Sequence, residues 1–162
     1  MVVKVILQDI KKVESDAIVV GFFEDVRPLK GLAGQLDWLL CGSLSGLLLK
    51  NKLRGSLGDV ALLTAREKVP SPKILMIGFG PWSGFSLSTL RNTARTVASS
   101  VLGVGATHAA LECLLPTDAS CDAGMSALRK GLEEGAGGRS LAISLLASDR
   151  ETYEKLFRLV KA

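Results

Sequence analysis

The 162-residue sequence has few aromatic residues, a single histidine and only three cysteines. One histidine and three separated cysteines cannot supply a clustered metal site, and no Cys-x-x-Cys pair is present. Aromatic residues make up 5% of the chain although 48% is hydrophobic, so the core must be mainly aliphatic, as in α/β domains. The composition therefore predicts no metal, and thiols used as small hydrophobes predict a reducing, cytoplasmic location.

Long hydrophobic runs and clusters of one charge are also missing. The most apolar stretch, residues 39–49, is interrupted by glycine and serine, and it is much shorter than the roughly 20 residues that span a bilayer. The net charge is +4, but lysine and arginine are scattered instead of gathered on one element. We therefore expect no membrane partner, and nucleic acid is an unfavoured partner.

Six apolar segments predict β-strands, and most of them are continuous runs typical of strands covered on both faces. They are residues 2–7, 17–22, 60–64, 74–77, 109–115 and 141–146. Four segments predict helices: a leucine-rich one over 32–50, and others over 87–103, 122–135 and 148–160. Ser148 and Glu151 form a capping-box pattern that opens the last helix.

The connections between these segments predict the fold. Residues 8–16 and 65–73 contain no helix, and links this short predict antiparallel neighbours. The other links pass through helices, which predicts right-handed parallel crossovers. We therefore expect a single α/β domain over residues 1–162. It should be a three-layer α/β/α fold with a mixed, mainly parallel sheet of about six strands and with about four helices.

Two glycine-rich turns are candidate binding loops, because backbone N–H groups at a strand-to-helix junction can hold an anion. The candidates are Gly31 and Gly34 before the first helix, and Gly78, Gly80 and Gly84 after the strand at 74–77. The later loop departs from Gly-x-Gly-x-x-Gly by one position, and Pro81 removes a donor. A plain strand-to-helix connection also explains the first loop, and we interpret the second as a tight turn that can still bind an anion.

No set of residues predicts a catalytic centre. His108 is the sole histidine and precedes an apolar strand, which favours a structural role over that of a general base. No Gly-x-Ser-x-Gly elbow is present. Arg91 and Arg95 lie one helical turn apart and could hold a phosphate, although a solvated helical stripe explains them better. We expect no catalytic residues and no cofactor.

Several stretches together carry a family resemblance. They are the run Asp-Ala-Ile-Val-Val-Gly-Phe-Phe-Glu at residues 16–24, and then residues 36–37, 42–44, 55–59, 73–80 and 90–94. In this order they resemble the N-terminal domain of the leucyl (cytosol) aminopeptidase family. The resemblance implies a macro-like fold over nearly the whole chain.

In that family a separate C-terminal domain performs the chemistry with two metal ions, and its Asn-Thr-Asp-Ala-Glu-Gly-Arg signature does not occur in these residues. The resemblance therefore implies a non-catalytic domain. Its partner would be another copy, making a homo-oligomer, or a separate aminopeptidase subunit.

The start of the chain also resembles ADP-ribose-binding macro domains. Gln8-Asp9-Ile10 is similar to their Gly-Asp-Ile, whose aspartate accepts a hydrogen bond from the adenine amino group. Where those domains place asparagines for the distal ribose, this chain has apolar residues at 20–23, which cannot bond sugar hydroxyls. A nucleotide is thus the alternative ligand, with Asp9 at its site, although a turn or cap role also explains Asp9. DNA binding is the weakest hypothesis.

Overall fold

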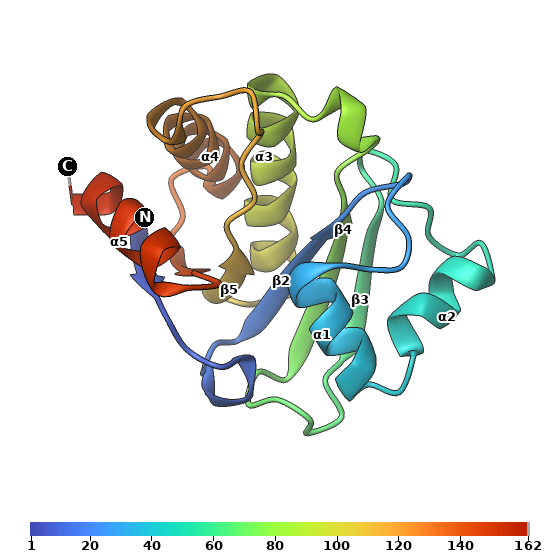
Figure 1. Ribbon diagram of the computed structural model, residues 1–162. Helices are drawn as coiled ribbons and strands as arrows, with labels where there is room; N and C mark the ends of the chain where they lie inside the picture. Colours follow the sequence, from blue (N-terminus) through green and yellow to red (C-terminus); the bar gives the residue numbers. More distant parts are fainter. Residues whose placement is uncertain (162) are drawn as a thin grey trace.

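The computed structural model describes residues 1–161 and contains a six-stranded sheet between two layers of helices (Figure 1). The strands are β1 (Val2–Ile6), β2 (Ala17–Phe22), β3 (Val60–Thr64), β4 (Lys73–Gly78), β5 (His108–Glu112) and β6 (Ala142–Leu146). The helices are α1 (Gly31–Leu39), α2 (Ser43–Leu49), α3 (Leu87–Gly103), α4 (Cys121–Ala136) and α5 (Arg150–Lys161), with 3-10 turns η1 (Ile10–Lys12) and η2 (Trp82–Gly84). The predicted three-layer α/β/α fold is confirmed.

The sheet has the strand order β1-β6-β5-β2-β4-β3. Every neighbouring pair is parallel except β3 and β4, which are antiparallel. The antiparallel pairing predicted for the link at residues 65–73 is therefore confirmed. Strands β2 and β4 lie inside the sheet with helices on both faces, which is why their sequences are apolar without alternation.

The link between β1 and β2 corrects the sequence prediction. β1 pairs with β6, whereas β2 pairs with β4 and β5, so residues 8–16 do not join antiparallel neighbours. The segment runs back past β6 and β5 with Ile10 and Val13 buried in the core. A helix is unnecessary because extended backbone covers about 3.3 Å per residue, enough for a short link to recross the sheet.

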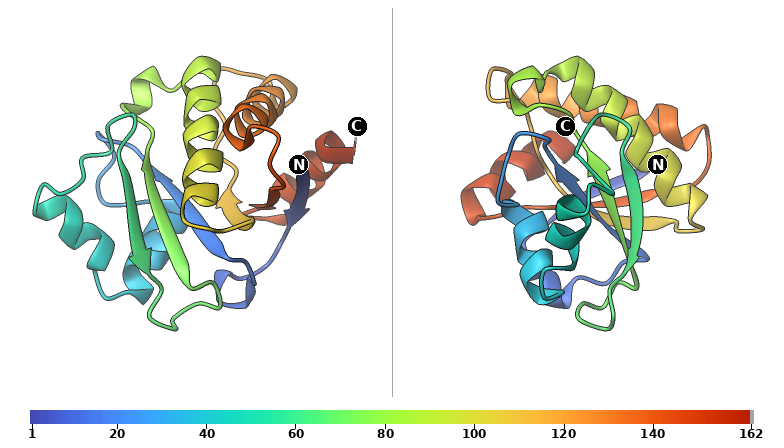
Figure 2. Two further views of the ribbon diagram at one scale, coloured as in Figure 1. Left: turned by 180° about the vertical axis from the view of Figure 1, so that it is seen from behind. Right: turned by 90° about the vertical axis from the view of Figure 1, so that its right-hand side faces the viewer.

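The two faces of the sheet have separate helical layers (Figure 2). One core cluster joins Val19, Leu75 and Ile143 of the sheet to helices α3, α4 and α5. The other joins Ile18 and Ile74 to helices α1 and α2. The layers therefore use alternate residues of the same strands, as the period of two in a strand requires.

The predicted helix over residues 32–50 is wrong, because the structure divides it into α1 and α2, bent by 106°. Cys41 and Gly42 between them adopt left-handed conformations with φ of 53° and 79°. The leucine pattern continues through the bend and hides it. Residues 1–161 accordingly contain five α-helices, one more than expected. No single helix among them has the length and hydrophobicity of a membrane span, and α1 and α2 reach those values only as a bent pair.

Two element ends also differ from the prediction. Helix α5 is capped by Asp149, whose Oδ1 accepts a hydrogen bond from Thr152 N at 2.8 Å. The cap is therefore one residue later than the capping box expected at Ser148 and Glu151, because a carboxylate is a stronger acceptor than a hydroxyl. Strand β5 ends at Glu112 instead of residue 115.

Candidate functional site

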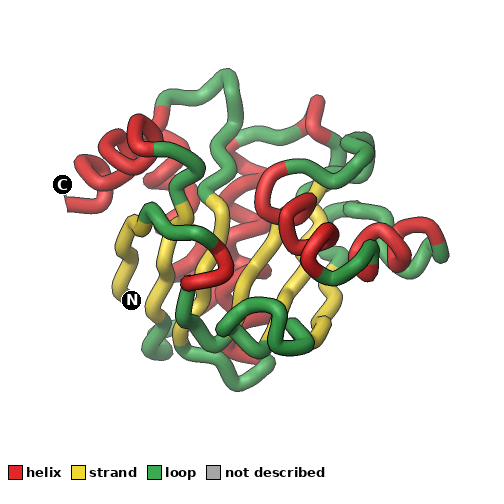
Figure 3. The backbone as a smooth tube through the Cα atoms, turned by 60° about the horizontal axis from the view of Figure 1, so that its bottom comes forward, coloured by secondary structure: helices red, strands yellow, loops and turns green. Residues whose placement is uncertain are grey.

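The carboxyl ends of the five parallel strands share one edge of the sheet, and the connections diverge there between β2 and β5. β2 leads to α1 on one face, whereas β5 leads to α4 on the other. Figure 3 shows the strands enclosed by these helices and their connecting loops. Open α/β sheets bind ligands at such a switch point, so this edge is the candidate site.

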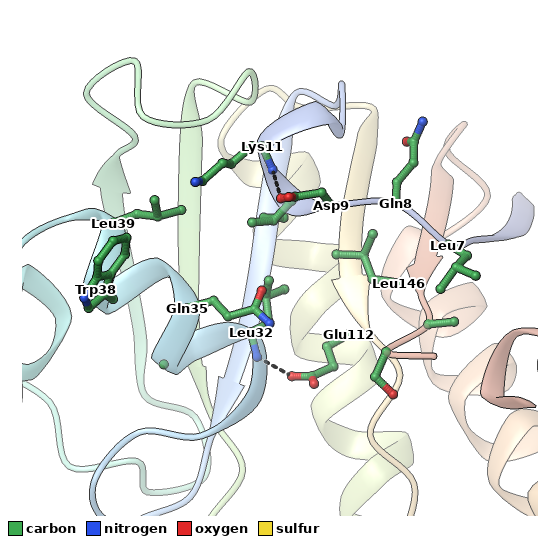
Figure 4. A pocket seen from close by; sticks show the side chains of 14 residues that line it. Leu7, Gln8, Asp9, Lys11, Leu32, Gln35, Trp38, Leu39, Glu112 and Leu146 are labelled. Carbon is green, nitrogen blue, oxygen red and sulfur yellow. Dashed lines mark hydrogen bonds between the residues drawn. The ribbon is translucent and has the colours of Figure 1, made fainter. Parts of the chain in front are cut away.

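A cleft of about 760 Å³ lies at this edge between α1 and the segment that follows β1 (Figure 4). Its lining includes apolar side chains and a few polar ones: Leu7, Gln8, Asp9, Leu32, Gln35, Trp38, Leu39, Glu112 and Leu146. Such a mixture is typical of small-molecule sites, in which polar groups orient a ligand on an apolar surface.

Glu112 is the half-buried carboxylate of this region, and it reaches the first turn of α1. Its Oε2 accepts a hydrogen bond from Leu32 N at 3.1 Å. A Cβ added to Gly31 would lie 2.7 Å from Oε1, so only glycine admits the carboxylate there. Burial raises the pKa of Glu112, and the Leu32 hydrogen bond offsets part of that shift. The carboxylate thus occupies the helix N-terminus at which a phosphate would otherwise bind.

The structure brings three of the predicted site residues to this region. Asp9 and Gly34 line the large cleft. Gly31 lines a second cavity of about 320 Å³, which shares Glu112 with the cleft. Asp9 also caps the 3-10 turn η1, since its Oδ1 accepts a hydrogen bond from Lys11 N at 2.9 Å. Ligand binding by these residues stays a prediction.

Gly78, Gly80 and Gly84 line neither of these two cavities. Their N–H groups donate to backbone carbonyls within the chain at 2.9, 2.8 and 3.1 Å. Gly78 is packed so closely against the backbone of residues 55–56 that a side chain would overlap it. Their role in turns and close packing accounts for these glycines, and the predicted anion loop gains no free donors from them.

The second cavity has mostly aromatic and aliphatic walls, to which Phe22, Phe23 and Trp82 contribute. The rings of Phe23 and Trp82 meet edge to face with centroids 4.8 Å apart. Phe22 and Phe23 therefore build part of this wall. They belong to the apolar residues at 20–23, where ADP-ribose-binding macro domains have asparagines. The sequence analysis missed Glu112, although an isolated acidic residue within the apolar run 109–115 was a signal for it.

At the opposite end of the sheet, His108 has the structural role expected for it. Its Nε2 lies 2.8 Å from the Oγ of Ser144, which is only 1% exposed. Asp16 Oδ2 accepts from the backbone N–H groups of Thr107 and His108, not from the imidazole. These residues do not form a nucleophile, base and orienting acid, because the serine is inaccessible and the acid does not contact the ring.

Arg91 and Arg95 do not form a free cationic stripe. Both contact Glu134 of α4, Arg91 through Nη2 and Arg95 through Nε at 3.3 Å. They link the two long helices, so neither a phosphate site nor an unpaired solvated stripe describes them. Within residues 1–161, no group of three or more His, Cys, Asp or Glu residues is placed to hold a metal ion.

The sheet order and its edge cleft define a macro-domain-like α/β protein. A Trypanosoma brucei macrodomain in complex with ADP matches 98% of this chain and 69% of its own, with a TM-score of 0.73 and 15% identity. A tomato leucine aminopeptidase mutant matches 99% of this chain and 35% of its own, with a TM-score of 0.69 and 19% identity. At these identities the likenesses show the fold alone.

The family follows from the sequence. Residues 19–136 match the family model of the cytosol aminopeptidase family, N-terminal domain, and the chain belongs to this family. A protein named "Probable cytosol aminopeptidase" from Cyanothece sp. is 39% identical over 85 residues, which are 52% of this chain and 17% of that protein. The curated relatives are much longer, and a Geobacter sulfurreducens relative is matched over 22% of its length. The predicted resemblance is confirmed.

Proposed function

We propose that this chain is a non-catalytic docking domain that binds a protein surface, either a second copy of itself or an aminopeptidase subunit. The observation that carries the proposal is the exposure of two large apolar side chains on the α1–α2 layer. Trp38 is 79% exposed and Leu49 is 84% exposed. Exposed side chains of this kind, and tryptophan above all, are characteristic of contact surfaces.

The core fixes the orientation of these side chains. Leu36 of α1 and Leu44 of α2 are fully buried against the sheet, and they anchor the two helices. Each helix therefore directs apolar side chains into the core and holds another outward. Trp38 and Leu49 project from an ordered layer, so a partner that covers them does not first have to order the surface.

The family gives a second argument. In the Cyanothece relative the matched segment is 17% of the protein, so most of that protein lies outside this domain. A domain that occurs within longer aminopeptidase chains can contact the rest of such a chain. A separate aminopeptidase subunit is therefore a chemically reasonable partner for the α1–α2 layer.

Multi-angle light scattering at tens of micromolar tests the proposal. We expect the protein to elute above its monomer mass of 17.1 kDa, or to co-elute with a cytosol aminopeptidase catalytic domain. The double variant Trp38→Ser/Leu49→Ser should lose that association while its thermal unfolding stays nearly unchanged, because both side chains are exposed. Val2→Ser is the matched control, since Val2 is 66% exposed but lies on edge strand β1.

A wild-type protein that is strictly monomeric and binds no aminopeptidase domain would contradict docking. Association that survives in the double variant would move the interface away from α1 and α2. Loss of association in Val2→Ser would place it at the edge of the sheet instead.

Nucleotide binding is the second candidate function. The cleft brings Asp9 and Gly34 together, and a macrodomain of the same fold was solved with ADP. Glu112 opposes this function, because its carboxylate occupies the N-terminus of α1 and repels a phosphate. Titration calorimetry with ADP-ribose decides: heat at millimolar ligand would support the nucleotide site, and the absence of heat would leave the docking function alone. DNA binding has the least support, because the basic residues are dispersed.

A further inference from the structure

We infer that the 320 Å³ cavity between β2, α1 and η2 is a binding site for a small organic cation, an ammonium group carried on an apolar chain. Glu112 supplies the negative charge, and Phe22, Phe23 and Leu114 supply apolar walls. The site is separate from the exposed side chains of the proposed docking surface. Docking and cation binding can therefore fail independently.

The first argument is an unpaired charge. The carboxylate of Glu112 is half buried, and its one protein hydrogen bond in the described chain comes from Leu32 N. Among residues 1–161, no lysine, arginine or histidine nitrogen forms a salt bridge with it. Lys30 lines the same cavity but is exposed and makes no such contact. A half-buried carboxylate without a counter-ion is stabilised by a cation that comes from outside.

The second argument is the aromatic rim. Trp82 lines the cavity and is 43% exposed, so part of the indole remains open to a ligand. Its position is fixed by the edge contact with Phe23 and by a hydrogen bond from its backbone N to Asp25 Oδ1 at 2.8 Å. An indole face attracts an ammonium group, and the adjacent carboxylate strengthens that attraction.

The third argument is the size of the cavity and the sign of the charge that lines it. A volume near 320 Å³ is at the lower end of small-molecule sites, so a compact ligand suits it better than a dinucleotide. An anion of the same length would place its charge against Glu112. The cavity therefore selects ammonium over carboxylate or phosphate ligands.

Fluorescence of Trp82 measures binding directly. In a Trp38→Phe background Trp82 is the remaining tryptophan. Three probes with one five-carbon chain, n-pentylammonium, pentan-1-ol and pentanoate, separate charge from apolar contact. We expect the ammonium probe to bind about tenfold more tightly than the alcohol, since a hydrogen bond to a charged group contributes roughly that factor or more. Pentanoate should not bind.

The variant Glu112→Gln keeps an acceptor for Leu32 N and removes the charge. It should weaken the ammonium probe about tenfold and leave the alcohol unchanged. Glu24→Gln is the matched control, because Glu24 is an exposed carboxylate at the same edge that bonds Ser56 Oγ. It should bind the ammonium probe as the wild type does.

Equal affinity for the ammonium probe and the alcohol in the Trp38→Phe background would overturn the inference, and this comparison leaves Glu112 unchanged. An unchanged ammonium affinity in Glu112→Gln would overturn it as well. Binding of pentanoate with an affinity similar to that of the ammonium probe would show that the site does not select for positive charge. The oligomeric state of Glu112→Gln should match that of the wild type, which keeps this result separate from the docking proposal.

Discussion

Two carboxylates at opposite ends of the sheet lie in opposite environments. Asp16, just before β2, accepts hydrogen bonds from Thr107 N and His108 N, both at 2.9 Å, and these bonds lower its pKa. Glu112, at the end of β5, is half buried with one donor, and this burial raises its pKa. The carboxylate of Asp16 therefore has its hydrogen-bond donors within its own chain. The carboxylate of Glu112 has acceptor positions left for a partner from outside the chain.

The surroundings of the two carboxylates repeat this difference. At the Asp16 end, His108 bonds Ser144, and Lys73 Nζ donates to the Val104 carbonyl at 3.1 Å. The Glu112 end instead contains both cavities described above. The polar groups named at the Asp16 end thus bond one another and the backbone, whereas Glu112 borders two cavities. The following substitutions test this division.

The largest effect is expected for Asp16→Ala, which removes the acceptor for two backbone N–H groups. We expect a loss of about 1 kcal/mol of unfolding free energy at neutral pH, a value reduced for the exposure of Asp16. Urea denaturation measures it, with Glu14→Ala, an exposed carboxylate nearby, as the control that should not change.

The pH dependence of Asp16→Ala follows from the lowered pKa. A carboxylate whose pKa is lower in the folded state stabilises the protein above its unfolded pKa, and this stabilisation is lost as the pH falls through the lowered folded value. The difference between wild type and Asp16→Ala should therefore shrink in acid. A difference that is the same at neutral and strongly acidic pH would contradict the assignment to the ionised carboxylate.

A smaller effect of opposite sign is expected for Glu112→Gln. Because burial raises the pKa of Glu112, its ionised form disfavours the folded state, and stability falls as the pH rises through the folded value. The variant should be about 0.5 kcal/mol more stable than wild type at neutral pH, and the gain should disappear below the unfolded pKa. Glu24→Gln is again the control. If Glu112→Gln is less stable than the wild type, then Glu112 is a hydrogen-bonded structural residue like Asp16. The proposed difference between the two carboxylates would then be wrong.

The smallest effect is expected for Asp9→Ala, a carboxylate at the same end as Glu112. Its one described hydrogen bond caps a three-residue turn, so unfolding free energy should change by less than about 0.5 kcal/mol. Calorimetry with ADP-ribose sharpens the result. If Asp9 is only a cap, wild type and variant will give the same trace, whereas a loss of nucleotide heat in the variant alone would assign it to a nucleotide site.

Much of the fold could be predicted, because the strands leave continuous apolar runs in the sequence. The apolar runs at 17–22 and 60–64 became strands with those same limits. The helix break at Cys41 could not be predicted, since the leucine pattern continues across it while the backbone enters a left-handed turn. The pairing of β1 with β6 depends on contacts between the two ends of the chain, which no local pattern records.

The candidate site was less predictable for a related reason. The importance of Glu112 comes from its position beside Gly31 of another element, not from its neighbours in the sequence. Conversely, Gly78 and Gly80 resembled a binding loop because glycine also serves close backbone packing, as at Gly78, and a positive φ, as at Gly80. Residue type indicated what each position permits, whereas the tertiary contacts decided what it does.

Helix α4 approaches α3 so closely that a methyl group added to Gly131 or Gly135 would overlap the carbonyl of Arg91 or Arg95. A larger residue at either glycine would therefore force the two helices apart. The loops that lead into these helices carry Trp82 and Leu114, so one wall of the small cavity is joined to this closely packed helix pair. A substitution that separates the two helices would therefore displace that wall as well.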